Sequence, residues 1–79
     1  MIDYDGPVPR YVQLAELIRD RIRAGQYLPD RRIPSEPDLS SETGLARETV
    51  RRGLRLLVDE GTLVRVPGKG TYVSPDPPV

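Results

Sequence analysis

Three arginines at helical spacing and a lysine between two glycines are the residues of this sequence best suited to chemistry. Arg47, Arg51 and Arg55 are four residues apart, so on a helix their side chains would lie on one face. A guanidinium group can donate paired hydrogen bonds to a guanine edge or to a phosphate. The segment Gly68-Lys69-Gly70 adds a cation within a turn. Taken alone, such a row more often forms a solvated face, so its interpretation depends on the rest of the chain.

The composition argues against catalysis and against a bound metal or cofactor. The sequence has no histidine and no cysteine, which are the usual zinc ligands and common catalytic groups. The segment around Lys69 also differs from a nucleotide-binding P-loop, which would need glycine in place of Leu63 and serine or threonine in place of Gly70. We therefore expect a protein that is not an enzyme and has no metal site and no cofactor.

The length and the N-terminus predict one small domain in a reducing compartment. A chain of 79 residues can bury a single core but has little room for a deep substrate cavity. The start of the chain is acidic, and no apolar run is long enough for a signal peptide or a membrane span. We expect a cytoplasmic protein with no membrane contact.

Charge is distributed unevenly along a chain whose formal net charge is zero. Residues 44–70 contain six cations and three anions, whereas residues 1–43 contain six cations and eight anions. A local cationic surface can attract an anionic partner even when the total charge is zero. The uneven distribution therefore keeps nucleic acid among the possible partners.

Hydrophobic spacing and turn residues predict three helices followed by a β-hairpin. We expect helices at about residues 10–24, 35–42 and 46–60, and strands at 63–66 and 71–73. The expected core-facing residues of the first and third helices share helical spacing; they are Tyr11, Leu14, Leu17, Ile18, Ile22, Val50, Leu54 and Leu57. The predicted fold class is α+β, mainly α.

Individual residues mark the expected boundaries of these elements. Gly25 is a helix C-cap signal, and Ser35 is an N-cap with Pro37 in the first turn and Asp38 as the acid of a capping box. Gly44 permits the positive φ of a tight turn. Residues 31–34 should be extended because they precede or include a proline.

The order of the elements predicts a winged helix-turn-helix, in which three helices precede a two-stranded hairpin wing. Two helices joined by a short turn, with exposed arginines on the second, are typical of a domain that places this second helix in the major groove. The division expected is a flexible lead at residues 1–8, the domain at 9–73 and a proline-rich tail at 74–79. An alternative is a winged-helix interaction module that binds an acidic protein partner.

Residues 9–73 resemble the N-terminal winged-helix domain of the GntR family of bacterial transcriptional regulators. The resemblance rests on the order and spacing of several short stretches: Pro9-Arg10-Tyr11 with Gln13, Gly25, Leu28-Pro29, Ile33-Pro34-Ser35-Glu36, Asp38-Leu39, Gly44-Leu45-Ala46-Arg47, Thr49-Val50-Arg51, Leu54, Leu57, Glu60-Gly61 and Gly68-Lys69-Gly70-Thr71-Tyr72-Val73. Each stretch alone is a weak signal, whereas together they are specific.

The resemblance implies roles for the cationic residues. Arg47 and Arg51 match arginines that contact bases or nearby phosphates, and Thr49 matches a threonine that touches the DNA backbone. Gly68 and Lys69 lie where the family's wing approaches the minor groove. The expected DNA-binding set is Ala46, Arg47, Glu48, Thr49, Arg51, Arg55, Gly68 and Lys69.

Several positions differ from the family pattern. Pro37 stands where the family usually has a cation, and Ala46 where a serine or threonine usually caps the recognition helix. Glu48 could accept a hydrogen bond from cytosine or pair with Arg52, for which Asp59 is another expected partner. Gly53 replaces a small alanine, which we attribute to close packing.

Together these features predict a sequence-specific transcriptional regulator that binds double-stranded DNA, and they favour a repressor. The resemblance implies a homodimer on a two-fold symmetric operator. Family members normally carry a C-terminal domain that binds a small effector and dimerises; we expect no effector site in these 79 residues, which correspond to an excised domain or a naturally short regulator. The operator, the regulated genes and the effector are not specified by the sequence.

Overall fold

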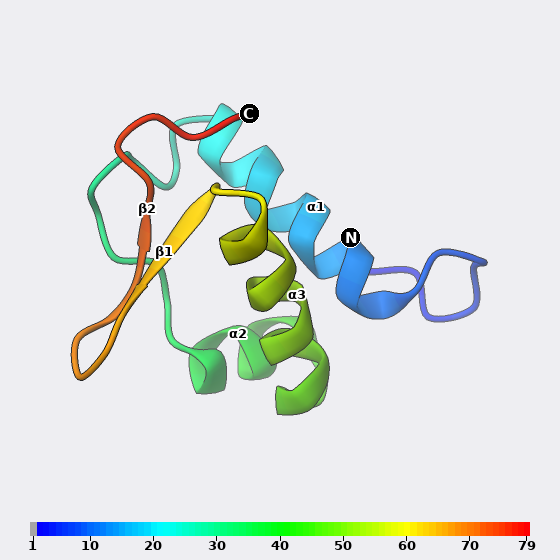
Figure 1. The fold of residues 1–79 in the computed structure, drawn as a ribbon. Coiled ribbons are helices and arrows are strands. Elements are labelled where there is room, and N and C mark those ends of the chain that lie inside the picture. The colour runs from blue at the N-terminus through cyan, green and yellow to red at the C-terminus, as the bar shows by residue number, and fades with distance from the viewer. Residues whose placement is uncertain (1) are drawn as a thin grey trace.

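Three helices and a two-stranded antiparallel sheet make up the computed structural model, which describes residues 2–79. The elements in chain order are α1 (Arg10–Arg23), α2 (Glu36–Thr43), α3 (Arg47–Asp59), β1 (Leu63–Val66) and β2 (Gly70–Val73) (Figure 1). The predicted order is confirmed, and the predicted ends of the elements differ from the observed ends by at most one residue. Among the described residues, no helix is long and apolar enough to cross a membrane.

The core forms where one face of α1 packs against α3 and the sheet. Leu14 and Ile18 of α1 are completely buried, as is Leu57 of α3. Burying an aliphatic side chain of this size contributes about 1.5–3 kcal/mol. Tyr11 and Leu17, which we also expected on the buried stripe, are only half-buried because they lie at its edges.

Gly53 allows α1 and α3 to approach each other closely. A Cβ atom at this buried position would lie 2.8 Å from Leu14 Cδ2 and 2.8 Å from the carbonyl oxygen of Tyr11. The second contact is with backbone, which cannot move aside as a side-chain end can. The prediction that this glycine serves close packing is therefore confirmed.

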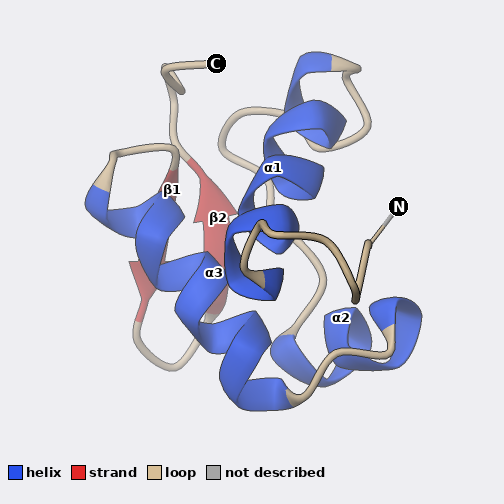
Figure 2. Ribbon diagram, turned by 90° about the vertical axis from the view of Figure 1, so that its right-hand side faces the viewer, coloured by secondary structure: helices blue, strands red, loops and turns tan. Residues whose placement is uncertain are grey.

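The hairpin contributes to the core through one of its two faces. Leu63 pairs with Val73, and both are buried against the helices, whereas the next pair, Val64 and Tyr72, is on the opposite face. Successive pairs lie on opposite faces because side chains alternate between the two faces along a strand. The base of the hairpin therefore packs on the helices and its tip extends away from them (Figure 1). In the side view the hairpin lies behind α3 (Figure 2).

The segment between α1 and α2 pairs with β2 through a short antiparallel bridge. The backbone N–H of Ile33 donates to the Thr71 carbonyl at 2.9 Å, and that of Val73 donates to the Arg31 carbonyl at 2.9 Å. The sequence predicted that residues 31–34 are extended, but not that they pair with β2. This pairing links the wing to the chain that leads into α2.

The residues before α1 lie against both α1 and the turn that precedes α3. Gln13 Nε2 donates to the Asp3 carbonyl at 2.7 Å, and the Tyr4 hydroxyl donates to the Thr43 carbonyl at 2.6 Å. The expected lead begins at Met1, which lies outside the described residues. The division into lead, domain and tail stays a prediction.

Candidate nucleic-acid interface

The first turns of α3, the start of α2 and the tip of the hairpin lie at the same end of the molecule (Figure 1). Helix α3 is held there by its apolar face, with Val50, Leu54 and Leu57 buried in the core. Beside this apolar stripe, Arg47 and Arg55 are exposed, one helical turn to either side of Arg51. The three predicted arginines therefore do form a row on the outer side of one helix.

Side-chain hydroxyls fix the turn between α2 and α3. Gly44 has a φ of 76°, which is the left-handed conformation that glycine adopts readily. The Thr43 hydroxyl donates to the Leu39 carbonyl at 2.7 Å, and the Ser40 hydroxyl donates to the Leu45 carbonyl at 2.6 Å. Leu45 is buried, so the turn is anchored in the core and sets the direction of α3.

The two helices of this pair begin differently. Ser35 Oγ accepts a hydrogen bond from the backbone N–H of Asp38 at 3.3 Å, which confirms the predicted N-cap of α2. Ala46 occupies the N-cap position of α3, where no side chain accepts a hydrogen bond. The start of the arginine-bearing helix is thus less stabilised than the start of α2.

The tip of the wing is a tight turn that presents Lys69. The backbone N–H of Lys69 donates to the Val66 carbonyl at 3.0 Å, with Pro67 and then Gly68, at a φ of 76°, between them. Proline followed by a glycine of positive φ is the signature of a type II turn. The sequence therefore determines how this lysine is presented.

The Arg32 side chain packs against the wing and donates a hydrogen bond to its backbone, a role that the sequence did not predict. Arg32 Nη1 donates to the Lys69 carbonyl at 3.2 Å. The side chain passes so close to Gly70 that a Cβ there would lie 2.8 Å from Arg32 Cδ. The only hint in the sequence is the extended segment before α2, because its partner is 37 residues away.

Arg51 differs from its neighbours on α3 because it contacts two carboxylates. Its Nη1 lies 3.0 Å from Glu48 Oε2, and its Nη2 lies 3.3 Å from Glu36 Oε1. The expected pair between Glu48 and Arg52 is wrong, since Glu48 is bonded to the residue three positions on. The expected alternative partner of Arg52, Asp59, is also wrong.

Arg52 stacks on an aromatic ring instead. Its guanidinium carbon lies 4.1 Å from the centre of the Tyr11 ring. A cation over an aromatic face is stabilised by the ring quadrupole, by about 0.5–1 kcal/mol at an exposed site. Arg52 thus joins α3 to α1 and is turned away from the arginine row.

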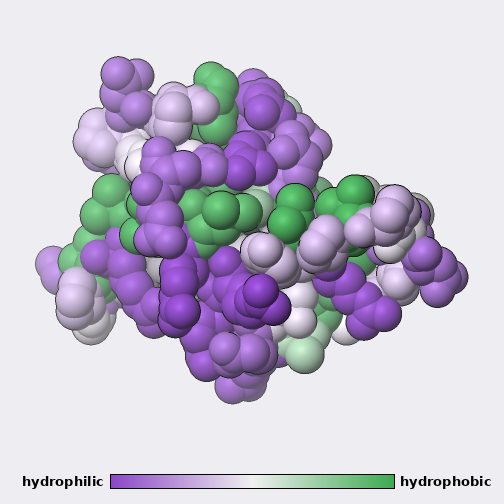
Figure 3. All heavy atoms as spheres, turned by 45° about the vertical axis from the view of Figure 1, so that its right-hand side comes forward, coloured by the Kyte–Doolittle hydropathy of each residue, from purple (hydrophilic) through white to green (hydrophobic). Residues whose placement is uncertain are grey.

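Arg47, Arg55 and Lys69 have no ion pair within residues 2–79, so their charge is available to a partner. Thr49, another predicted site residue, is half-buried near the start of α3. The lower half of the molecule, where this end lies, is mostly hydrophilic (Figure 3). The structure therefore brings the predicted residues to two neighbouring places, the first turns of α3 and the wing tip.

A groove of about 660 Å³ separates the start of α2 from the wing. Its walls contain three cations, Arg32, Arg65 and Lys69, and two anions, Glu36 and Asp38. Within the described part of the chain, no group of acidic residues is arranged to hold a metal ion. The groove is thus a mixed-charge surface with a cationic excess on its wing side.

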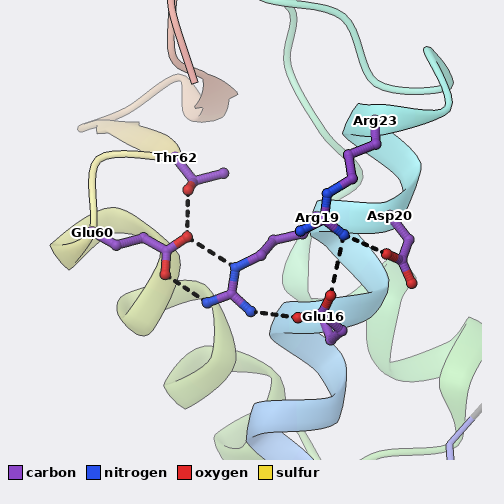
Figure 4. A network of polar contacts seen from close by, with 6 residues as sticks. All are labelled: Glu16, Arg19, Asp20, Arg23, Glu60 and Thr62. Atoms are coloured by element: carbon purple, nitrogen blue, oxygen red, sulfur yellow. Dashed lines mark hydrogen bonds and ion pairs between the residues drawn. The ribbon is translucent and has the colours of Figure 1, made fainter. Parts of the chain in front are cut away.

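On α1, by contrast, three of the four arginines form internal ion pairs, and the fourth, Arg10, stacks on the Tyr4 ring. Arg19 donates to both oxygens of Glu60, at 3.0 and 2.5 Å, and to Glu16 at 2.9 Å (Figure 4). Hydrogen bonding from Arg19 holds the pKa of Glu60 below its ordinary value of 4.5, against the opposing effect of burial. Arg21 pairs in the same way with Glu42, whose pKa is also lowered.

The fold and this surface define a winged helix-turn-helix protein, with a cationic recognition-type helix beside a cationic wing. The sequence model for "Bacterial regulatory proteins, gntR family" matches residues 10–73. The chain therefore belongs to the gntR family of bacterial regulatory proteins, as the sequence predicted.

Individual relatives agree with this assignment. The chain is 41% identical to the HTH-type transcriptional repressor NagR of Bacillus subtilis (strain 168), over 92% of this chain and 30% of NagR. It is 44% identical to the histidine utilization repressor of Klebsiella aerogenes, over 86% of this chain and 28% of that protein. The chain thus spans less than a third of the length of these two relatives.

Two solved structures match this chain over most of their own length. AraR(DBD), crystallised in complex with operator ORX1, superposes with a TM-score of 0.85 and 37% identity, covering 94% of this chain and 95% of that chain. YtrA from Sulfolobus acidocaldarius, a GntR-family transcription factor, superposes with a TM-score of 0.87 and 33% identity, covering 96% of this chain and 80% of YtrA. The predicted winged-helix fold is confirmed.

Proposed function

We propose that this chain is the sequence-specific, double-stranded DNA-binding module of a transcriptional repressor. The observation that carries the proposal is the row of α3 arginines beside the wing lysine, in which Arg47, Arg55 and Lys69 have no internal ion pair within residues 2–79. Exposed, unpaired cations suit phosphates and guanine edges. The similarity to repressors and to an operator-bound domain supports the same conclusion.

Each predicted residue has a distinct proposed role. Helix α3 enters the major groove, where Arg51 contacts a base edge, Arg47 contacts bases and a nearby phosphate, and Arg55 contacts a phosphate. Gly68 and Lys69 approach the minor groove or the backbone from the wing. Around the row, Ala46, Glu48 and Thr49 lie near the DNA at the start of α3, and Glu48 orients Arg51 through their ion pair.

We further propose that the chain acts as a homodimer in the cytoplasm. A homodimer would place two copies of α3 in successive major grooves, so the operator would be two-fold symmetric with half-sites about one helical turn apart, or a multiple of it. A repressor of this kind acts on the bacterial chromosome, and we propose the cytoplasm as its compartment. Effector binding would belong to parts of longer relatives that this chain does not match.

Selection of bound sequences from a random duplex pool tests the proposal. The wild-type chain should recover one motif, and a motif with two inverted halves would support the dimer. The variant R47A/R51A/R55A should recover none, whereas R23A, which removes an arginine of α1, should recover the wild-type motif. Recovery of no motif by the wild type would exclude sequence-specific binding, and binding to an acidic protein instead would favour the interaction module.

A further inference from the structure

One carboxylate lies between the recognition-type helix and the wing. Glu36, the first residue of α2, accepts a hydrogen bond from Arg51 Nη2 at 3.3 Å through Oε1, while its Oε2 lies 4.0 Å from Arg65 Nη2 on β1. Its side chain is 22% exposed, so this carboxylate is largely shielded from solvent. Glu36 therefore contacts both parts of the proposed DNA-binding surface at once.

The ion pairs give Arg51 an electrostatic environment unlike that of the other α3 arginines. Arg51 and Arg65 face the carboxylates of Glu36 and Glu48, so these four side chains have no net charge. A cation that already has carboxylate partners gains less from a phosphate, because binding the phosphate displaces or competes with those partners. Arg51 is thus better suited to a base edge, where geometry determines the energy.

The two carboxylates also restrict the orientation of Arg51. A guanidinium group has five N–H bonds. One on Nη1 goes to Glu48 and one on Nη2 goes to Glu36, which leaves three for a partner. Because the two carboxylates belong to different helices, they fix the plane of the guanidinium more firmly than one could. A fixed plane is what discrimination between base edges requires.

We infer that Glu36 is a specificity-determining positioning residue, which holds Arg51 in its base-reading orientation and ties it to Arg65 of the wing. The inference rests on the proposed function. Glu36 itself need not touch DNA. Its negative charge, at the edge of the groove between α2 and the wing, also opposes binding to phosphates of any sequence.

Three single variants separate position from charge. E36Q keeps the shape but removes the charge, and E36D keeps the charge but withdraws it by one methylene. D38N is the matched control, because Asp38 lies in the same helical turn and the same groove but has no ion pair in the described structure. Thermal unfolding of each variant establishes that it is folded.

The measurement is the affinity for the duplex selected by the wild type, and for duplexes with single base-pair changes, over a series of salt concentrations. E36Q and E36D should both lose about tenfold in discrimination at the position read by Arg51. In E36Q alone, the slope of log K against log salt should steepen by up to about 0.9, the value for one additional phosphate. D38N should retain wild-type discrimination.

Two results would overturn the inference while leaving the proposed function intact. In the first, E36Q and E36D discriminate as well as the wild type. In the second, D38N loses as much discrimination as they do, which would mean that any negative charge in this groove has the same effect as Glu36. A wild-type chain that selects no motif would refute the proposed function, and the inference with it. The two failures are therefore distinguishable in one set of titrations.

Discussion

The arginines of α1 and those of α3 carry the same charge in different environments. Arg19 and Arg21 are each 18% exposed and are bonded to carboxylates outside α1, those of Glu60 and Glu42. Arg47 and Arg55 are exposed and have no ion pair among residues 2–79. One set of arginines is used to hold the fold together, and the other is left for a partner.

This comparison explains how a chain with no net charge can present a cationic surface. Four of the twelve acidic residues pair with arginines of α1, whereas none pairs with Arg47 or Arg55 among residues 2–79. Arg51 is intermediate, since it lies on the outer face of α3 but has two carboxylate partners. Substitutions of the exposed α3 arginines should therefore change DNA binding, whereas substitutions of the ion-paired α1 arginines should change stability.

The largest expected effect is on base discrimination. R51A should lower the preference for the selected duplex over single base-pair variants by about 1–3 kcal/mol, because one bidentate contact to a base is lost. Its stability should fall by less than about 1 kcal/mol, the range for partly exposed ion pairs. Competition titrations measure the first quantity and urea unfolding the second. A large loss of stability with unchanged discrimination would show that Arg51 stabilises the fold, as the ion-paired arginines of α1 do, and does not read bases.

The next largest effect is expected on stability, for a variant where α3 packs on α1. G53A should lower the free energy of unfolding by about 1–2 kcal/mol, because overpacking against the Tyr11 carbonyl outweighs the gain of about 1 kcal/mol in helix propensity. Urea unfolding provides the measurement. Greater stability in G53A would mean that α1 and α3 separate easily, contrary to the close packing described above.

Acid should weaken the α1 networks selectively. Because the folded-state pKa values of Glu16, Glu42 and Glu60 lie below 4.5, their contribution to stability is present above that pH and is lost as the pH falls through the folded values. The variant R19Q should be about 1 kcal/mol less stable near pH 7 and should lose less on acidification. Equal acid sensitivity of R19Q and the wild type in a pH series of thermal melts would contradict this assignment.

The smallest expected effect concerns the wing. K69A should weaken binding to all duplexes to a similar degree and make the slope of log K against log salt about 0.9 less negative, since one phosphate contact is lost. K69R is the matched control and should retain the wild-type slope. A change in base preference in K69A would instead show that the wing reads sequence.

The fold could be predicted from local signals in the sequence. Gly25, Ser35 and Gly44 mark the ends of α1 and α2 because each satisfies a backbone requirement at its own position. The close packing at Gly53 could be predicted for a similar reason, since a glycine within a helix lowers stability unless it meets a steric need.

The partners of the charged side chains could not be predicted in the same way. Helical spacing allowed Glu48 to pair with Arg52, but the stacking of Arg52 on Tyr11 depends on how α1 crosses α3. Glu36 and Arg51 are 15 residues apart, and Arg32 and Lys69 are 37 apart. Such contacts are set by the tertiary fold, which is why the division of arginines into paired and unpaired groups emerges only from the structure.

The salt dependence of duplex binding tests the central claim most directly. If Arg47, Arg55 and Lys69 each neutralise one phosphate, the slope of log K against log salt for one copy of the chain should be about −3 or steeper. In the variant R47A/R55A/K69A the slope should be less negative by about 2.7, which is about 0.9 for each of the three phosphates, while unfolding should be like that of the wild type. A flat salt dependence of the wild type, or an unchanged slope in the triple variant, would contradict the claim that these unpaired cations are the DNA-binding surface.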